Sequence, residues 1–116
     1  MDERIEKAFE TANYMATLSN QKRIIKEEFE QALIYYINGS TFQINSALIA
    51  YVNTVVKSDQ ATEVVFIDTN GIPVLIDNIQ KFYSDITAQY TKATRTYFEK
   101  YSDIRVKRKI KDIVEL

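Results

Sequence analysis

The clearest structural signal in the sequence is Val64-Val65-Phe66-Ile67-Asp68-Thr69-Asn70-Gly71-Ile72-Pro73-Val74-Leu75-Ile76. β-branched and aromatic residues stand on both sides of an Asn-Gly pair, which is a strong signal for a β-hairpin. The sequence therefore predicts two antiparallel strands, at residues 64–67 and 72–76. Pro73 cannot donate a backbone hydrogen bond, so its strand should lie at a sheet edge or have Pro73 facing outward.

A third strand and a short helix are predicted before this hairpin. Residues 41–44 alternate polar and apolar side chains, as a half-buried strand does. Asn45 or Ser46 can cap a helix, because its side-chain oxygen accepts a hydrogen bond from a free backbone N–H of the first turn. The apolar residues of this helix recur at helical spacing, and they are Leu48, Ile49, Val52, Val55 and Val56.

A long helix is predicted after the hairpin, opening at Asp77 as its cap. Its apolar and aromatic positions follow steps of three and four residues, close to a heptad repeat. They are Ile79, Tyr83, Ile86, Tyr90, Ala93, Tyr97, Tyr101 and Ile104, and a helical pattern continues to Val114.

A second long helix is predicted from Asp2 to Ile37, with Asn38-Gly39 as its end. Its apolar residues form two sets at helical spacing, Ile5, Ala8, Phe9, Ala12, Met15 and Ala16, then Ile25, Phe29, Ala32, Leu33 and Tyr36. Ser19 and Asn20 lie between the sets and prefer caps to helix interiors, so either a break or a shift of the apolar face is expected there.

The length of 116 residues predicts a single domain over 1–116. A compact domain of this size is on the order of 35 Å across, whereas a helix from residue 2 to 37 is about 54 Å long. We therefore expect two long antiparallel helices, a short helix and a three-stranded antiparallel sheet, an α+β fold in the order α-β-α-β-β-α. This arrangement would bring the acidic first turns (Asp2, Glu3, Glu6, Glu10) beside the basic last turns.

The basic last turns are a candidate binding patch, made of Arg105, Lys107, Arg108, Lys109 and Lys111. Residues 105–116 hold five cations and two acids, whereas the rest of the chain is net acidic. The cations could contact nucleic-acid phosphates, but the chain has no basic stripe elsewhere. A solvated or internally paired helix end is therefore the favoured interpretation, and nucleic-acid binding is the alternative.

The composition argues against most enzyme chemistry. The chain has no Cys, His or Trp, which removes the thiolate nucleophile, the usual general base and the usual transition-metal ligands. Asp68-Thr69-Asn70-Gly71 resembles the start of a calcium loop, but the required Gly and Glu are out of place. We expect no catalytic residue, no metal or other cofactor, and no small-molecule substrate. The start of the chain has neither a signal peptide nor a membrane span, so a cytoplasmic location is expected.

Tyrosine is unusually abundant, with eight residues. Tyr83, Tyr90 and Tyr97 repeat every seven residues along one helix edge, and Tyr101 continues the seam. A stacking platform for bases is one interpretation. A helix seam or subunit interface is favoured, because Tyr buries a large ring and needs only one partner for its hydroxyl.

Three segments together give a family resemblance, MDERIEKAFETANYMATLSNQKRI at residues 1–24, VVFIDTNGIPV at 64–74 and KRKIKDIVEL at 107–116. The whole chain resembles a small uncharacterised protein of marine cyanobacterial phages with contractile tails. The resemblance carries no activity and no functional residues, but it implies the cytoplasm of an infected bacterial host or the virion. The long helix seams, the abundant tyrosine and the absent catalytic residue types favour a non-enzymatic protein that acts through protein contacts as a homo-oligomer, without a membrane partner. The resemblance adds that it is a phage-type protein.

Overall fold

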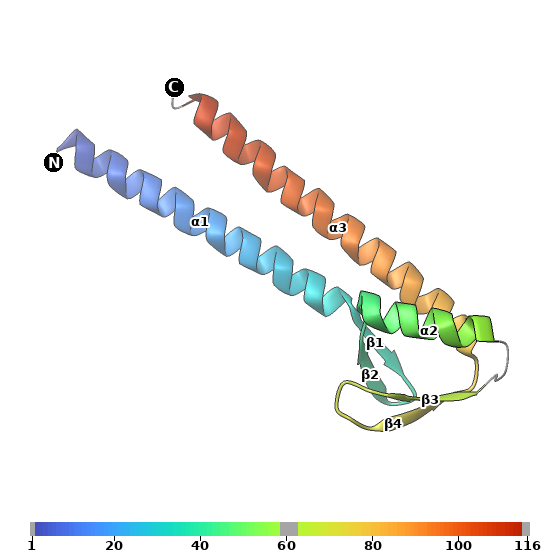
Figure 1. Cartoon of the computed structure of the whole chain (residues 1–116). Coiled ribbons are helices and arrows are strands. Elements are labelled where there is room, and N and C mark those ends of the chain that lie inside the picture. Colours follow the sequence, from blue (N-terminus) through green and yellow to red (C-terminus); the bar gives the residue numbers. More distant parts are fainter. Residues whose placement is uncertain (1, 59–62, 115–116) are drawn as a thin grey trace. The chain divides into compact units, whose positions relative to one another are not determined.

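The computed structural model describes residues 2–58 and 63–114, and in the last helix it describes side chains up to residue 106. The elements in these residues are α1 (Glu3–Ala32), β1 (Ile34–Ile37), β2 (Ser40–Gln43), α2 (Ser46–Ser58), β3 (Val64–Ile67), β4 (Pro73–Ile76) and α3 (Ile79–Val114) (Figure 1). This confirms the α+β class. Internal contacts divide the chain into two compact units, which we call unit 1 (residues 1–29 and 96–116) and unit 2 (residues 30–95).

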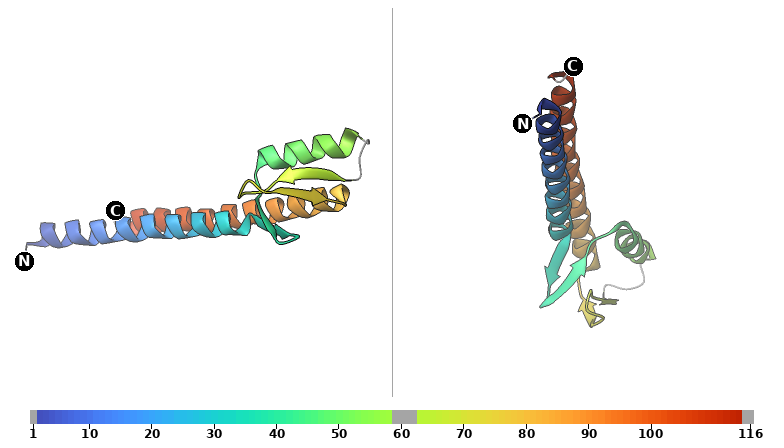
Figure 2. Two further views of the ribbon diagram at one scale, coloured as in Figure 1. Left: turned by 90° about the horizontal axis from the view of Figure 1, so that it is seen from below. Right: turned by 90° about the vertical axis from the view of Figure 1, so that its left-hand side faces the viewer.

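Unit 1 is a pair of helices. Residues 3–29 of α1 and 96–114 of α3 lie side by side and run in opposite directions (Figures 1 and 2). The Phe29 and Tyr97 rings pack at a tilt of 37° with centroids 4.5 Å apart, and the Lys100 ammonium pairs with the Glu28 carboxylate. The predicted antiparallel arrangement is confirmed for this pair.

The first hairpin of unit 2 corrects the sequence prediction at the end of α1. The helix ends at Ala32, and Ile34–Ile37 is strand β1, which pairs with β2 in the register Ile34↔Gln43 to Ile37↔Ser40. Asn38 and Gly39 both have positive φ, 51° and 75°, as a two-residue hairpin turn requires. The prediction of a helix to Ile37 was wrong because Asn-Gly, taken as a helix stop, is instead the turn between two strands.

The second hairpin is confirmed, with β3 and β4 paired from Val64↔Ile76 to Ile67↔Pro73. The chain turns through Asp68-Thr69-Asn70-Gly71, where Gly71 takes a φ of 78°. One carboxylate oxygen of Asp68 accepts hydrogen bonds from the backbone N–H groups of Asn70 (2.9 Å) and Ile72 (2.8 Å). Pro73 is exposed and lies on an edge strand, as expected.

The predicted three-stranded sheet is wrong. The described strands form two separate two-stranded antiparallel sheets, β1–β2 and β3–β4. Strand β1, which the helix prediction absorbed, pairs with one edge of β2, and the second hairpin meets β2 through its turn and not along a strand. The turn of the second hairpin still contacts β2, because the Thr69 N–H donates to the Thr41 carbonyl at 3.0 Å.

The helices of unit 2 begin at asparagine caps. The Asn45 side chain accepts a hydrogen bond from the Leu48 N–H (2.8 Å), which confirms the predicted cap of α2. Asn78, not Asp77, caps α3 by accepting from the Lys81 N–H (3.0 Å). The Gln89 side-chain amide donates to the Ala32 and Ile34 carbonyls (2.7 and 2.9 Å) and so ties α3 to the point where α1 becomes β1.

The core of unit 2 is centred on Phe82, a residue of the first turn of α3 whose ring packs against three other aromatic rings. Its centroid lies 5.4–5.6 Å from the rings of Tyr35, Phe42 and Phe66, which come from β1, β2 and β3. The side chains around this cluster are almost completely buried, and they include Ile44, Val52, Ile76 and Ile86. Both hairpins and both helices of the unit therefore share one core.

Candidate interaction surfaces

The N-terminal half of α1 presents its apolar residues away from α3. Leu18 is only 5% exposed, whereas Phe9, nine residues earlier on the same helix, is 57% exposed. Residues nine apart are turned by about two and a half turns, so they lie on opposite faces. Ala16 and Ile25 are related in the same way. The expected shift of the apolar face is therefore found within one continuous helix, and no break occurs.

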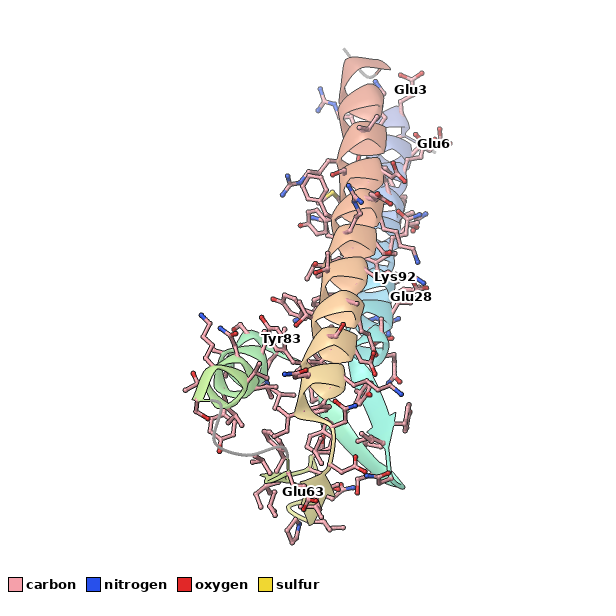
Figure 3. The ribbon with its side chains drawn as sticks, turned by 90° about the vertical axis from the view of Figure 1, so that its right-hand side faces the viewer. Glu3, Glu6, Glu28, Glu63, Tyr83 and Lys92 are labelled. Atoms are coloured by element: carbon pink, nitrogen blue, oxygen red, sulfur yellow. The ribbon has the colours of Figure 1, made fainter. Side chains whose placement is uncertain are left out.

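The outward stripe, as we call it, consists of Ile5, Phe9, Ala12 and Ala16, spaced by four, three and four residues. Ile5 is 47% exposed, and both alanines are exposed. Figure 3 shows Glu3 and Glu6 at the same end of α1. The stripe is thus an apolar helix face with acidic residues near its beginning.

Tyr97 and Tyr101 pack inside the helix pair of unit 1. The Tyr97 ring packs on the Phe29 ring, and its centroid lies 6.1 Å from that of Tyr101. Two cations approach the Tyr101 ring, the Lys22 ammonium at 5.6 Å and the Arg105 guanidinium at 4.8 Å from the centroid. These two tyrosines therefore serve a helix seam within the chain.

Tyr83 and Tyr90, the other two candidate tyrosines, belong to unit 2 and are half-buried. Tyr83 projects from the start of α3 on the side where α2 is drawn (Figure 3). The heptad repeat thus crosses from unit 2 into unit 1, with two of the four tyrosines in each.

The register of the helix pair offsets the two charged ends. Glu28 lies against Lys100, and Lys22 shares the Tyr101 ring with Arg105. Because the two helices are antiparallel, residues later in α3 lie opposite residues earlier in α1. Residues 105–111 therefore come opposite about residues 16–22. The acidic turns at 2–10 therefore begin further along than the residues that come opposite the basic turns. The expected docking of the acidic and basic ends stays a prediction. Of the candidate basic patch only Arg105 is described, because the side chains of Lys107, Arg108, Lys109 and Lys111 lie outside the described residues.

A second exposed apolar surface lies on the β3–β4 hairpin. Val65, Ile67 and Leu75 are each more than half exposed, whereas Phe66, Val74 and Ile76 on the opposite face are buried. The register places Val65 against Leu75 and Ile67 against Pro73, so the exposed residues share one face. A hairpin that is apolar on both faces resembles a strand pair covered on both sides.

The most perturbed titratable group among the described residues is Tyr35 in unit 2. Its hydroxyl donates a hydrogen bond to the Asp85 carboxylate at 3.0 Å. Burial, this hydrogen bond and the negative charge of Asp85 raise the pKa of Tyr35 from 10.0 to about 12. The tyrosine is therefore a hydrogen-bond donor at neutral pH and is further from ionisation than a free tyrosine, which suits a structural role.

The Asp68 carboxylate organises the turn of the second hairpin. One carboxylate oxygen is occupied by the two backbone N–H groups, and the other is buried without a hydrogen-bond partner. Among the residues that the structure describes, no three carboxylates are grouped to hold a metal ion. The carboxylate thus shapes the turn.

In the described part of the chain, no helix is both long and apolar enough to cross a membrane. Comparisons with protein-family models, curated proteins and solved structures give no match. The outward stripe is the surface that sequence reasoning missed, although its residues had been identified as an apolar set. The nine-residue steps from Phe9 to Leu18 and from Ala16 to Ile25 were the signal that two opposite faces are apolar.

Proposed function

We propose that this chain is a non-enzymatic phage-type protein that acts through protein contacts and assembles as a homo-oligomer. The observation that carries the proposal is the outward stripe, because a helix that is apolar on both faces has one more apolar face than a single neighbouring helix can cover. The exposed face of the β3–β4 hairpin supports the same class of function. The resemblance to phage proteins supports a location in the infected bacterial cytoplasm or in the virion.

The absence of Cys and His from the sequence supports the non-enzymatic part of the proposal. Tyr35, the titratable group with the clearest shift, has its pKa moved away from neutrality, whereas a general acid or base is tuned toward it.

The test is the molar mass of the protein in solution, measured by light scattering at protein concentrations from about 1 to about 200 μM. We expect wild type to exceed the 13.5 kDa of one chain. Phe9→Lys should raise the dissociation constant at least tenfold, because it places a charge in the apolar contact. Gln31→Lys is the matched control, since Gln31 is exposed on the same helix but lies beyond residues 5–16, which carry the stripe. A wild type that is monomeric throughout this range would overturn the proposal.

The alternative from the sequence is nucleic-acid binding through the basic last turns. It is tested by titrating duplex DNA at low salt with wild type and with Lys107→Glu plus Lys109→Glu. Binding that disappears in the variant and falls steeply with salt would support this alternative. Binding that survives the variant would exclude the basic turns as its site.

A further inference from the structure

We infer that the outward stripe pairs with the same stripe of a second copy in antiparallel orientation, with Ile5 against Ala16 and Phe9 against Ala12 of the second copy. The inference rests on the proposed self-association and specifies its surface, direction and register. The second copy is the occupant because the stripe is complementary to itself in size, and because pairing sets Glu6 beside polar residues that can donate hydrogen bonds to it.

The complementarity in size follows from the spacing of the stripe. In an antiparallel pair, a step forward on one helix is a step back on the other. The register that places Ile5 against Ala16 therefore also places Phe9 against Ala12, and the two-fold axis repeats both contacts. Every large side chain meets a small one, so the helices can approach to about 8 Å, the close end of the usual range.

A parallel pair lacks this match. It would set Phe9 beside Phe9 and Ala12 beside Ala12, so one part of the contact would be crowded and the next part loose. It would also bring the acidic first turns of both copies to the same end, where like charges and aligned helix dipoles repel.

The charges beside the stripe are compatible with the antiparallel register. Glu6 lies on the flank of the stripe, and Asn13 and Thr17 lie on the same flank further along the helix. A two-fold axis perpendicular to the helices brings the same flank of both copies together, so Glu6 comes beside Asn13 and Thr17 of the second copy. These side chains can donate hydrogen bonds to a carboxylate, and no carboxylates are set against each other.

Exposure of the stripe makes the contact available without refolding. Ile5 and Phe9 are about half exposed and both alanines are exposed, while the opposite face of α1 carries the contact with α3 through Leu18, Ile25 and Phe29. Pairing through the outward stripe therefore leaves the helix pair of each copy intact.

The test uses single cysteines, because the natural chain has no Cys and every disulfide must come from the introduced thiols. Ile5→Cys and Ala16→Cys are purified separately, then oxidised alone and as a mixture. We expect the mixture to give a disulfide-linked dimer that contains one chain of each variant. Each variant alone should stay largely uncross-linked, because identical positions lie about 16 Å apart along the pair.

The cross-linking outcomes distinguish antiparallel pairing through the outward stripe from self-association in general. Cross-linking of Ile5→Cys with itself would indicate parallel pairing and overturn the inference, while the proposed self-association would stand. An oligomeric wild type whose cysteine mixture gives no mixed dimer would also overturn the inference. A monomeric wild type would overturn both.

A second variant distinguishes this register from nonspecific hydrophobic association. Ala12→Phe adds apolar area but places two rings at one contact, so we expect at least a tenfold rise in the dissociation constant. Gln31→Phe is the control, since it adds the same ring to an exposed position of the same helix, beyond the residues that the two copies would share. Tighter association of Ala12→Phe than of wild type would overturn the register.

Discussion

The two units of the chain use similar residues but bury them to very different degrees. Unit 2 places large side chains from both hairpins and both helices in one core, and Phe82, Ile86 and Val52 are at most 1% exposed. In the described residues of unit 1, only Leu18 and Ile104 are buried, at 5% and 6% exposure. Unit 2 therefore has a core that large side chains fill from several elements, whereas the helix pair of unit 1 has a thin seam and an uncovered apolar face.

The largest effect should come from the centre of unit 2. Phe82→Ala removes the ring that contacts Tyr35, Phe42 and Phe66, so we expect the free energy of unfolding to fall by about 3–5 kcal/mol. The measurement is urea unfolding followed by circular dichroism. Phe98→Ala is the matched control on the same helix, because Phe98 is 70% exposed and its loss should cost less than about 0.5 kcal/mol. Equal costs for the two variants would remove the contrast between the units.

Leu18→Ala tests whether the seam of unit 1 has its own stability. We expect a loss of about 2–3 kcal/mol, near the lower end for a buried leucine because few layers surround it. Hydrogen exchange should accelerate in residues 3–29 and 96–106 and stay unchanged in unit 2, as expected for two units that open separately. Ile24→Ala, at a half-exposed position of the same helix, should have a smaller effect on the same amides. Uniform acceleration across both units would show instead that they unfold together.

Asp68 holds the turn of the second hairpin, so its loss tests unit 2 away from its aromatic centre. Asp68→Ala leaves the N–H groups of Asn70 and Ile72 without their acceptor, and we expect a cost of about 2 kcal/mol in urea unfolding. Asp68→Asn keeps a side-chain oxygen at the same place and should retain most of the stability. If both variants lost the same amount, the negative charge rather than the acceptor would be what the turn needs.

Much of unit 2 could be predicted from the sequence because its signals are local. The hairpin at residues 64–76, its Asn-Gly turn and the Asn45 cap are each specified within a few residues. Strand β1 could not be predicted in this way, because Asn38-Gly39 suits both a helix end and a hairpin turn. What decides between them is tertiary, since Tyr35 packs on Phe82 and the Gln89 amide binds the Ala32 and Ile34 carbonyls.

The candidate surface was only half predictable for a related reason. The spacing shows that α1 has two apolar sets on opposite faces, but both sets have suitable residues for packing on a helix. Which face meets α3 depends on the pairing of Phe29 with Tyr97 and of Glu28 with Lys100, which are far apart in the sequence. The outward stripe is therefore defined by the register of unit 1 and not by its own composition.

The smallest effect should come from the polar contact at the margin of the unit 2 core. Tyr35→Phe keeps the ring against Phe82 and removes the hydrogen bond to Asp85, so we expect a loss of about 1 kcal/mol at pH 7. The pKa of Tyr35 is higher in the folded protein, about 12 against 10.0. The folded state therefore favours the protonated hydroxyl, and the stabilisation is fully present below pH 10 and is lost as the pH rises toward 12.

Two measurements test this direction of the Tyr35 pKa shift. The difference in unfolding free energy between wild type and Tyr35→Phe should shrink from pH 9 to pH 12, and the ultraviolet difference titration at 295 nm should show one tyrosinate forming near pH 12 in wild type only. Asp85→Asn keeps an acceptor for the hydroxyl but removes the negative charge, so it should move this titration toward lower pH while retaining part of the stability. A Tyr35 that ionised near pH 10 in wild type would show that the core of unit 2 does not extend to this contact, and the contrast between the two units would then rest on the aromatic centre alone.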